Sequence, residues 1–229
     1  MPRFEAVLFD MDGTILDTLA DIGESMNRVL TSFGFTSHPL DAYRYLVGEG
    51  SAVLVEKALP DTARKPDIIQ KCLRAYQEDY GCHWREHTRL YPGIAELLDG
   101  LLDRNVRMAI LSNKFHEFTW QCYEHFFKRW PIDPVLGIRD GIPRKPDPAA
   151  ALEIAEYLGL SPSRILYVGD TAVDMKTAVS AGMFPVGVLW GFRTREELLA
   201  NGAQFLAEHP VQILEHFFPL QGGGPANNR

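Results

Sequence analysis

The stretch Phe9-Asp10-Met11-Asp12-Gly13-Thr14 begins at the last residue of the apolar run Ala6-Val7-Leu8-Phe9, near the start of the chain. A continuous apolar run of this length is typical of a parallel strand that is covered on both faces. Ligands of open α/β sheets bind outside the carboxyl ends of such strands, and Gly13 frees the backbone there for a tight turn. Two carboxylates crowded into such a place repel each other unless a cation joins them. The stretch therefore indicates a metal-binding site, with a plain Asp-Gly turn as the alternative.

The composition is that of an ordinary globular protein, with 46% hydrophobic and 23% charged residues among 229. A formal charge of -7 argues against a nucleic-acid-binding surface. The three cysteines form no Cys-x-x-Cys pair, so neither a disulfide framework nor a thiolate zinc site is indicated. No apolar run is long enough for a membrane span, and the N-terminal run is too short for a signal peptide. We therefore expect a cytoplasmic protein that binds neither nucleic acid nor a membrane.

The apolar pattern divides the chain into a core and an insertion. From Leu19 to about Arg89 apolar residues fall at helical spacing, without a strand signal. Strand signals then return and alternate with helical patterns, at residues 106–111, 134–136, 165–168 and, as the last strand, 185–189. Such alternation predicts an α/β fold with a doubly wound, mainly parallel, Rossmann-like sheet. We expect an α/β core of residues 1–15 and 91–220, a helical domain of residues 16–90 and a disordered tail of residues 221–229.

Polar side chains gather where the predicted strands end. They are Asp10 and Asp12, Ser112 and Asn113, Lys145, and Asp170 with Asp174. This set suits phosphoryl transfer, which needs a nucleophile, a proton donor, a divalent cation and donors for the phosphoryl oxygens. Asp10 could attack phosphorus, and Asp12 could protonate the leaving group and then activate water. Asp170 would complete a Mg²⁺ shell, because oxygen ligands suit that ion better than zinc. The phosphate would be held by Ser112, Asn113 and Lys145.

Four motifs in chain order resemble those of the haloacid dehalogenase superfamily of phosphatases: Asp10-x-Asp12-x-Thr14, Ser112, Lys145 and Gly169-Asp170-x-x-x-Asp174. The resemblance spans the whole predicted core, and residues 16–90 look like the small helical cap of that family. It implies a hydrolase of phosphoric monoesters that works through an aspartyl-phosphate, with Asp10 as the nucleophile and Asp12 as the general acid/base. A second aspartate at position 12 marks the phosphotransferase members of the superfamily rather than its dehalogenases.

The resemblance also implies the remaining site residues. Mg²⁺ would be the cofactor, held by Asp10, Asp170 and the main-chain carbonyl of Asp12, with Asp174 as a ligand or as a supporting partner. The expected catalytic residues are Asp10, Asp12, Ser112 and Lys145. The expected phosphate-binding residues are Thr14, Ser112, Asn113 and Lys145.

Two segments look similar to the phosphoglycolate phosphatase branch of the superfamily. They are Val47-Gly48-Glu49-Gly50 with the apolar run that follows it, and Tyr91-Pro92-Gly93 at the return to the core. The expected substrate is therefore a small phosphomonoester similar to 2-phosphoglycolate. Two alternatives remain open: a phosphomutase that returns the phosphoryl group to a sugar, and a non-catalytic protein that binds a phosphometabolite.

A few polar residues of the insertion receive no chemical role. Arg44 and Lys57 could reach a substrate carboxylate, but exposed charges on helices are the commoner case. His83 and His87 are spaced for a metal on one helix face, beside Cys82, yet no further ligand is fixed by the sequence. We interpret both histidines as solvated or hinge side chains.

Overall fold

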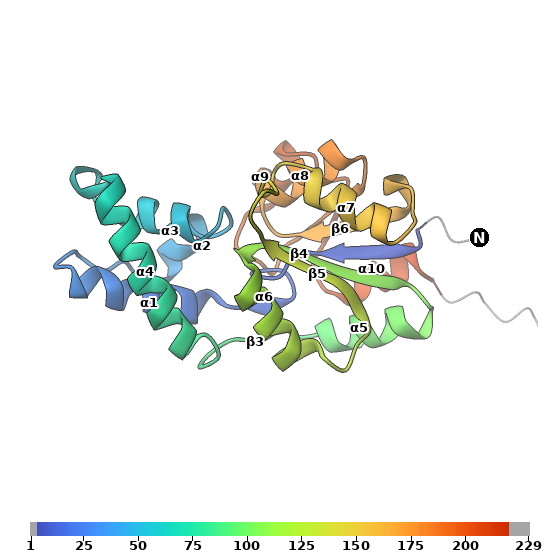
Figure 1. The fold of residues 1–229 in the computed structure, drawn as a ribbon. Coiled ribbons are helices and arrows are strands. Elements are labelled where there is room, and N and C mark those ends of the chain that lie inside the picture. The colour runs from blue at the N-terminus through green and yellow to red at the C-terminus, as the bar shows by residue number, and fades with distance from the viewer. Residues whose placement is uncertain (1–3, 220–229) are drawn as a thin grey trace, which may run out of the picture.

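The computed structural model describes residues 4–219, which are built around a six-stranded parallel sheet with helices on both faces (Figure 1). The strand order is β5-β4-β1-β6-β7-β8, so the chain winds outward in both directions from β1. The predicted doubly wound α/β fold is therefore confirmed. The strands are β1 Ala6–Phe9, β4 Arg107–Phe115, β5 Ile132–Ile138, β6 Ile165–Gly169, β7 Phe184–Val188 and β8 Phe205–Ala207.

The first strand is buried at every position, and its side chains pack on both faces of the sheet. Val7 and Phe9 enter the larger hydrophobic cluster, whereas Ala6 and Leu8 enter the smaller one. This alternation follows from the two-residue period of a strand. The smaller cluster is covered by α7 (Ala149–Tyr157) and α8 (Ala172–Ala181), and the opposite face by α5 (Ile94–Asp103) and α10 (Val211–Phe217). Burial on both faces fixes β1, and with it the position of Asp10 just beyond its end.

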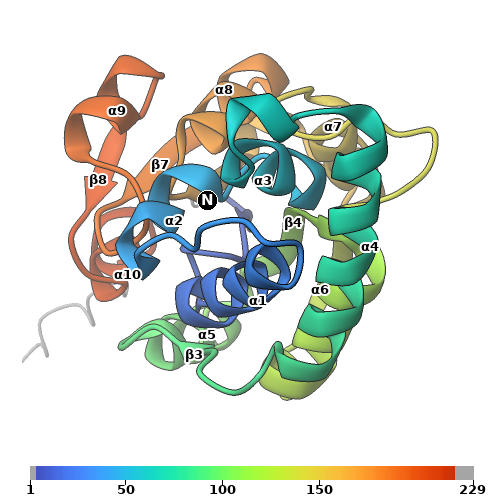
Figure 2. The same ribbon diagram turned by 90° about the vertical axis from the view of Figure 1, so that its left-hand side faces the viewer.

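Four helices pack together beyond the carboxyl ends of the strands, and they lie in front of the sheet in Figure 2. They are α1 Leu19–Ser32, α2 Tyr43–Leu46, α3 Ser51–Ala58 and α4 Pro66–His83, and we call them, with their connecting segments, the cap. Two short strands, β2 Leu16–Asp17 and β3 Arg89–Leu90, pair antiparallel where the chain enters and leaves the cap. No strand was predicted there, because two residues are too few to show a period.

The structure differs from the sequence-based prediction in the extent of three further elements. Strand β4 continues through the polar trio at residues 112–114, which was expected just beyond the strand. The strand at 184–188 is not the last, because β8 follows it as a three-residue edge strand. The apolar spacing at residues 117–128 predicts one helix, whereas the structure has an α-helix, α6 His116–Cys122, that passes into a π-helical turn, Tyr123–Phe127.

The remaining described elements are short. They are α9 Arg195–Ala200 and the 3₁₀ turns Leu40–Ala42, Asp61–Ala63 and Pro162–Arg164. No helix within residues 4–219 combines the length and the apolar character that a membrane span requires. The predicted disordered tail, residues 221–229, lies outside the described residues.

Asp21 of α1 ties the cap to the chain that returns to the core. Its buried carboxylate accepts hydrogen bonds from the backbone N–H groups of His87 and Thr88, at 2.8 and 2.9 Å, and from the Thr88 hydroxyl at 2.7 Å. Buried donors that lose such an acceptor are costly because water does not replace it. This carboxylate therefore holds the end of the cap against its beginning.

Replacing Asp21 by alanine should lower the free energy of unfolding by about 3 kcal/mol, because buried donors to a charged group lose their acceptor. Urea denaturation followed by circular dichroism measures the change. Asp41→Ala serves as the matched control, since the Asp41 side chain is 86% exposed, and should shift stability by no more than about 0.5 kcal/mol. Equal stabilities of the two variants would contradict this account of Asp21.

Candidate active site

Lys145 lies at the centre of a buried charged cluster at the carboxyl ends of the strands. Its Nζ atom lies 2.8 Å from Oδ1 of Asp10, beyond β1, and 2.7 Å from Oδ1 of Asp174, in the first turn of α8. It also donates a hydrogen bond of 3.0 Å to the carbonyl oxygen of Leu111 in β4. The three donors of the ammonium group thus have three acceptors, and the side chain is fixed. The structure therefore brings together Asp10, Lys145 and Asp174, as expected.

The carboxylates near Lys145 carry more charge than one lysine can balance. Oxygen atoms of Asp10, Asp170 and Asp174 lie within 4.8 Å of one another, and all three residues are buried. Burial, together with the nearby charge of Asp174, raises the pKa of Asp10 well above its ordinary value, although Lys145 opposes the shift. The same two causes raise the pKa of Asp170 to about 7. A divalent cation would relieve this repulsion, and an all-oxygen donor set fits a hard cation such as Mg²⁺.

The carboxylate of Asp174 is engaged by protein groups on both oxygens. Oδ1 accepts from Lys145, and Oδ2 accepts from the backbone N–H and the hydroxyl of Thr171, at 3.1 and 2.7 Å. The latter contacts form a capping box, in which Thr171 in turn caps the N-terminus of α8. Asp174 is thus oriented by the helix that it begins. Its contact with a metal stays a prediction.

Asp170 is held by the turn that follows β1. Its Oδ1 accepts from the Thr14 hydroxyl at 3.1 Å, and its Oδ2 accepts from the Phe192 N–H at 2.7 Å. Gly13 makes this approach possible, because a Cβ atom at that position would lie 2.3 Å from Oδ2 of Asp170, and its φ is +85°. The Thr14 side chain, expected at the phosphate, is directed to Asp170 here. Its phosphate contact stays a prediction.

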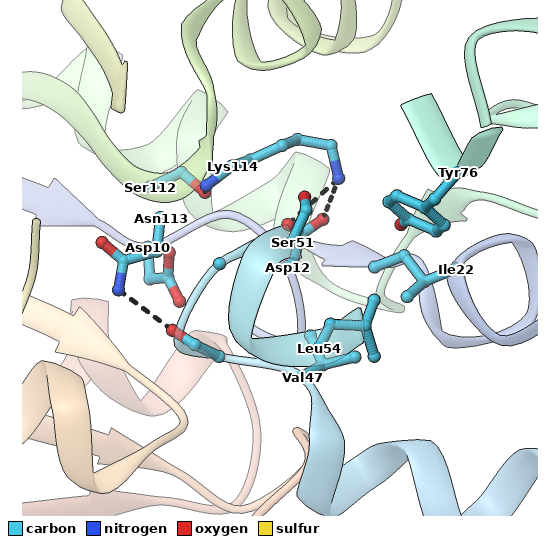
Figure 3. Close-up of a pocket in the computed structure, with 12 residues that line it drawn as sticks. Asp10, Asp12, Ile22, Val47, Ser51, Leu54, Tyr76, Ser112, Asn113 and Lys114 are labelled. Carbon is cyan, nitrogen blue, oxygen red and sulfur yellow. Dashed lines mark hydrogen bonds and ion pairs between the residues drawn. The ribbon is translucent and has the colours of Figure 1, made fainter. Parts of the chain in front are cut away.

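Asn113 connects the Lys145 segment to the cap. Its Oδ1 accepts from the Lys145 N–H, and its Nδ2 donates to the carbonyl oxygens of Lys145 and of Gly48, at 3.0 and 3.1 Å. Ser112 precedes it in β4, and its hydroxyl accepts the Lys114 N–H at 3.2 Å. Ser112 and Asn113, two of the four expected phosphate-binding residues, line the pocket shown in Figure 3 together with Asp10.

Lys114 is a site residue that the sequence analysis did not select. Its Nζ atom lies 2.9 and 3.1 Å from the two carboxylate oxygens of Asp12, and 4.7 Å from the centre of the Tyr80 ring in α4. Burial would lower the pKa of this ammonium group, but the groups around it, Asp12 foremost, together raise it. Ser112 and Lys114 share a face only because β4 continues through residues 112–114, beyond the predicted end of the strand.

A pocket opens between these polar residues and the cap (Figure 3). It has about 430 Å³ of space between the protein atoms, counted out to its mouth and including open solvent. The core contributes Asp10, Asp12, Ser112, Asn113 and Lys114. The cap contributes mainly apolar side chains and glycines, namely Ile22, Val47, Gly48, Gly50, Ser51, Leu54 and Tyr76. The site therefore combines charged groups on the core side with an apolar roof.

Reciprocal contacts hold the cap against the core beside this pocket. Arg44 donates to the carbonyl oxygen of Gly191 at 2.9 Å, and Arg193 donates to the carbonyl oxygen of Val47, also at 2.9 Å. With the bond from Asn113 to Gly48, they fasten the loop between α2 and α3 to the core. The structure thus has the cap closed over the strand ends.

Comparisons with known proteins identify the class of this protein. The family model of haloacid dehalogenase-like hydrolases matches residues 7–188, and the chain belongs to that family. The resemblance expected from the motifs is confirmed.

Comparison with individual proteins gives a narrower likeness than the family model. The chain is 32% identical to a phosphoglycolate phosphatase of Pseudomonas putida and 30% identical to one of Pseudomonas fluorescens, in each case over 97% of this chain and 80% of the relative. Among solved structures, a predicted phosphoglycolate phosphatase from Haemophilus somnus is 25% identical, with a TM-score of 0.86 over 94% of this chain and 98% of the other.

Mg²⁺ should stabilise the protein more at pH 8 than at pH 5. The pKa of Asp170 lies at about 7 in the folded protein against an ordinary value of 3.8, so the metal-free fold loses stability as the pH rises between these values. Above that range the ionised carboxylates bind the cation without competition from protons. At a hundredfold excess over Kd the gain would be about 2.7 kcal/mol, or about 5–10 °C in Tm.

Differential scanning calorimetry with Mg²⁺ or with EDTA at both pH values measures this difference. Asp170→Asn should abolish the Mg²⁺-dependent shift at pH 8. Glu24→Gln is the control, because Glu24 belongs to a more exposed acidic group with Glu86 and His87, and it should leave the shift unchanged. A shift of the same size at both pH values would argue against a metal at the buried carboxylates.

Proposed function

We propose that the protein is a Mg²⁺-dependent phosphatase that hydrolyses a small phosphomonoester of the 2-phosphoglycolate type through an aspartyl-phosphate on Asp10. One observation carries this proposal: the buried Asp10 carboxylate, ion-paired to Lys145, lies with Asp12 in the wall of a pocket beneath the cap. The relatives named phosphoglycolate phosphatase support the choice of substrate.

Asp10 would act as the nucleophile and Asp12 as the proton carrier. A carboxylate oxygen of Asp10 forms a bond to phosphorus while the bond from phosphorus to the ester oxygen breaks. Asp12 gives its proton to the leaving oxygen, which departs as an alcohol. Asp12 then takes a proton from water, the water oxygen bonds to phosphorus, and Asp10 leaves as a carboxylate. The products are an alcohol and inorganic phosphate.

The other residues would balance charge and fix geometry. Ser112 and Asn113 lie at the pocket beside Asp10, and Lys145 offsets the negative charge of Asp10 behind it. Asp10, Asp170 and the main-chain carbonyl of Asp12 would hold the cation, with Asp174 beside them. When bound, Mg²⁺ supplies positive charge next to the phosphoryl oxygens.

The pocket favours a small substrate over a sugar phosphate. A sugar presents several hydroxyl groups, each of which needs a hydrogen-bond partner once water is excluded. Within the part of the chain described, the only cap side chains at the pocket that carry a polar group are Ser51 and Tyr76, each with one hydroxyl. A short leaving group fits this roof better than the sugar of a phosphomutase substrate.

Asp10→Asn should abolish the release of phosphate from both p-nitrophenyl phosphate and 2-phosphoglycolate, because an amide does not serve as the nucleophile. Asp12→Asn should depress 2-phosphoglycolate turnover far more than turnover of the aryl ester, whose leaving group needs little protonation. A colorimetric phosphate assay measures all rates. Asp103→Asn, at an exposed position on α5, is the control. Undiminished turnover by Asp10→Asn would refute the mechanism.

Lys145→Ala should lower kcat by a factor of about 10² or more and weaken substrate binding, because a fixed positive charge beside the nucleophile is lost. Lys145→Arg should recover part of the activity, since it keeps the charge but its planar fork does not match the three acceptors of the ammonium group. Steady-state kinetics separates the two effects. Lys176→Ala, at an exposed position on α8, is the control. Near-normal turnover by Lys145→Ala would contradict a role for Lys145 in catalysis.

A further inference from the structure

Lys114 differs from the other cations near the pocket in what its ammonium group is free to bind. Within residues 4–219 it is the one positively charged side chain that lines the pocket. The three N–H donors of the Lys145 ammonium group already have three acceptors, so no donor is left for a ligand. Lys114 faces only the carboxylate of Asp12 and the face of the Tyr80 ring among its described contacts. It therefore keeps capacity to bind an anion that enters the pocket.

The basic side chains of the cap and its border are engaged elsewhere. Lys57 pairs with Glu49 at 2.6 Å, and Arg44 pairs with Asp41 while it also donates to Gly191. Arg193 donates to the carbonyl oxygen of Val47. None of these three lines the pocket. A second negative charge on a substrate would thus meet Lys114 first.

The environment of Lys114 makes such a contact strong. Its side chain is 5% exposed, and Tyr76 of α4 lies across the pocket from it in Figure 3. Ile22 and Leu54 are two further apolar side chains of the roof. A carboxylate placed against this roof without a partner would lose its hydration at a large cost, whereas one bound to an ammonium group would not. The pocket therefore accepts an acidic leaving group only where Lys114 can reach it.

The position of Asp12 sets which acids qualify. As the proton donor, Asp12 must lie within about 2.7 Å of the ester oxygen of the substrate. Lys114 Nζ lies 2.9 Å from Asp12, so both groups border the same small volume. A carboxylate one methylene group away from the ester oxygen would fall within reach of Nζ. An uncharged alcohol of the same size offers the ammonium group nothing comparable.

We propose that Lys114 is the specificity-determining residue of this site, and that it selects phosphomonoesters of 2-hydroxy acids by binding their carboxylate. The inference rests on the proposed function, since it concerns the leaving group of that reaction. It adds that the selection is made by a core residue on β4, next to Ser112 and Asn113, and not by a basic residue of the cap. Tyr80 of α4 supports it by covering the ammonium group.

The test compares two esters that differ in charge: 2-phosphoglycolate and 2-hydroxyethyl phosphate. We expect the wild-type protein to prefer the acid by at least about tenfold in kcat/KM. In Lys114→Met, which keeps the length of the side chain without its charge, this preference should fall by about tenfold to a hundredfold, mainly through KM. Lys57→Met is the matched control and should keep the wild-type preference.

The outcomes separate the inference from the proposed function. Wild-type protein that hydrolyses neither ester would refute both. Wild-type protein that hydrolyses both, with a preference that Lys114→Met leaves unchanged, would keep the phosphatase and overturn the role of Lys114. An equal loss on both esters would mean that Lys114 serves only to place Asp12, which also overturns the selection.

A binding measurement covers the case in which Lys114→Met is inactive. In the Asp10→Asn background, where no turnover occurs, calorimetry compares the affinity for 2-phosphoglycolate with and without Lys114→Met. The affinity should fall by about tenfold or more, while that for 2-hydroxyethyl phosphate should change little. Thermal unfolding of each variant checks that it is folded. Equal losses for the two ligands would overturn the proposal.

Discussion

The ammonium group of Lys145 is the interaction on which the geometry of this site depends. It joins Asp10 from the end of β1, Asp174 from the start of α8 and the Leu111 carbonyl of β4, so it ties three elements of the core to one atom. Buried carboxylates without such a partner would repel one another or take up protons. These three contacts also explain the two hydrogen bonds from the Asn113 side chain to the backbone of Lys145, because a small shift of that segment would break all three.

The central strand and the polar strand ends were predictable because each leaves a local mark. Residues 6–9 are apolar at every position, which only a strand covered on both faces requires, and the carboxylates that follow stand out against them. That positions 10, 112, 145 and 170 come together could be inferred, since strand ends meet at one edge of the sheet. The sequence therefore predicted which residues gather there, and their chemical roles stay predictions.

Other features depend on contacts that leave no mark in the local pattern. The importance of Lys114 comes from Asp12 and from Tyr80 of the cap, both distant in sequence, and a lysine after Ser112-Asn113 reads as one more polar residue at a strand end. Likewise, the hydrogen bond that directs Thr14 to Asp170 spans most of the chain. Strand β8 was missed because an edge strand of three residues shows no period.

The paired strands β2 and β3 make the cap an insertion that can vary independently of the core. The chain leaves the core at β2 and returns to it at β3, and these two strands are hydrogen-bonded to each other. The segment between them can therefore change without a change in the main sheet. The three partners of Lys145 all belong to the core. Evolution can thus exchange or reshape the helices over the pocket while the charged cluster keeps its form. A new cap would thus change the shape and the apolar contacts around a leaving group, whereas Lys114, which belongs to β4, would stay with the charged residues of the core.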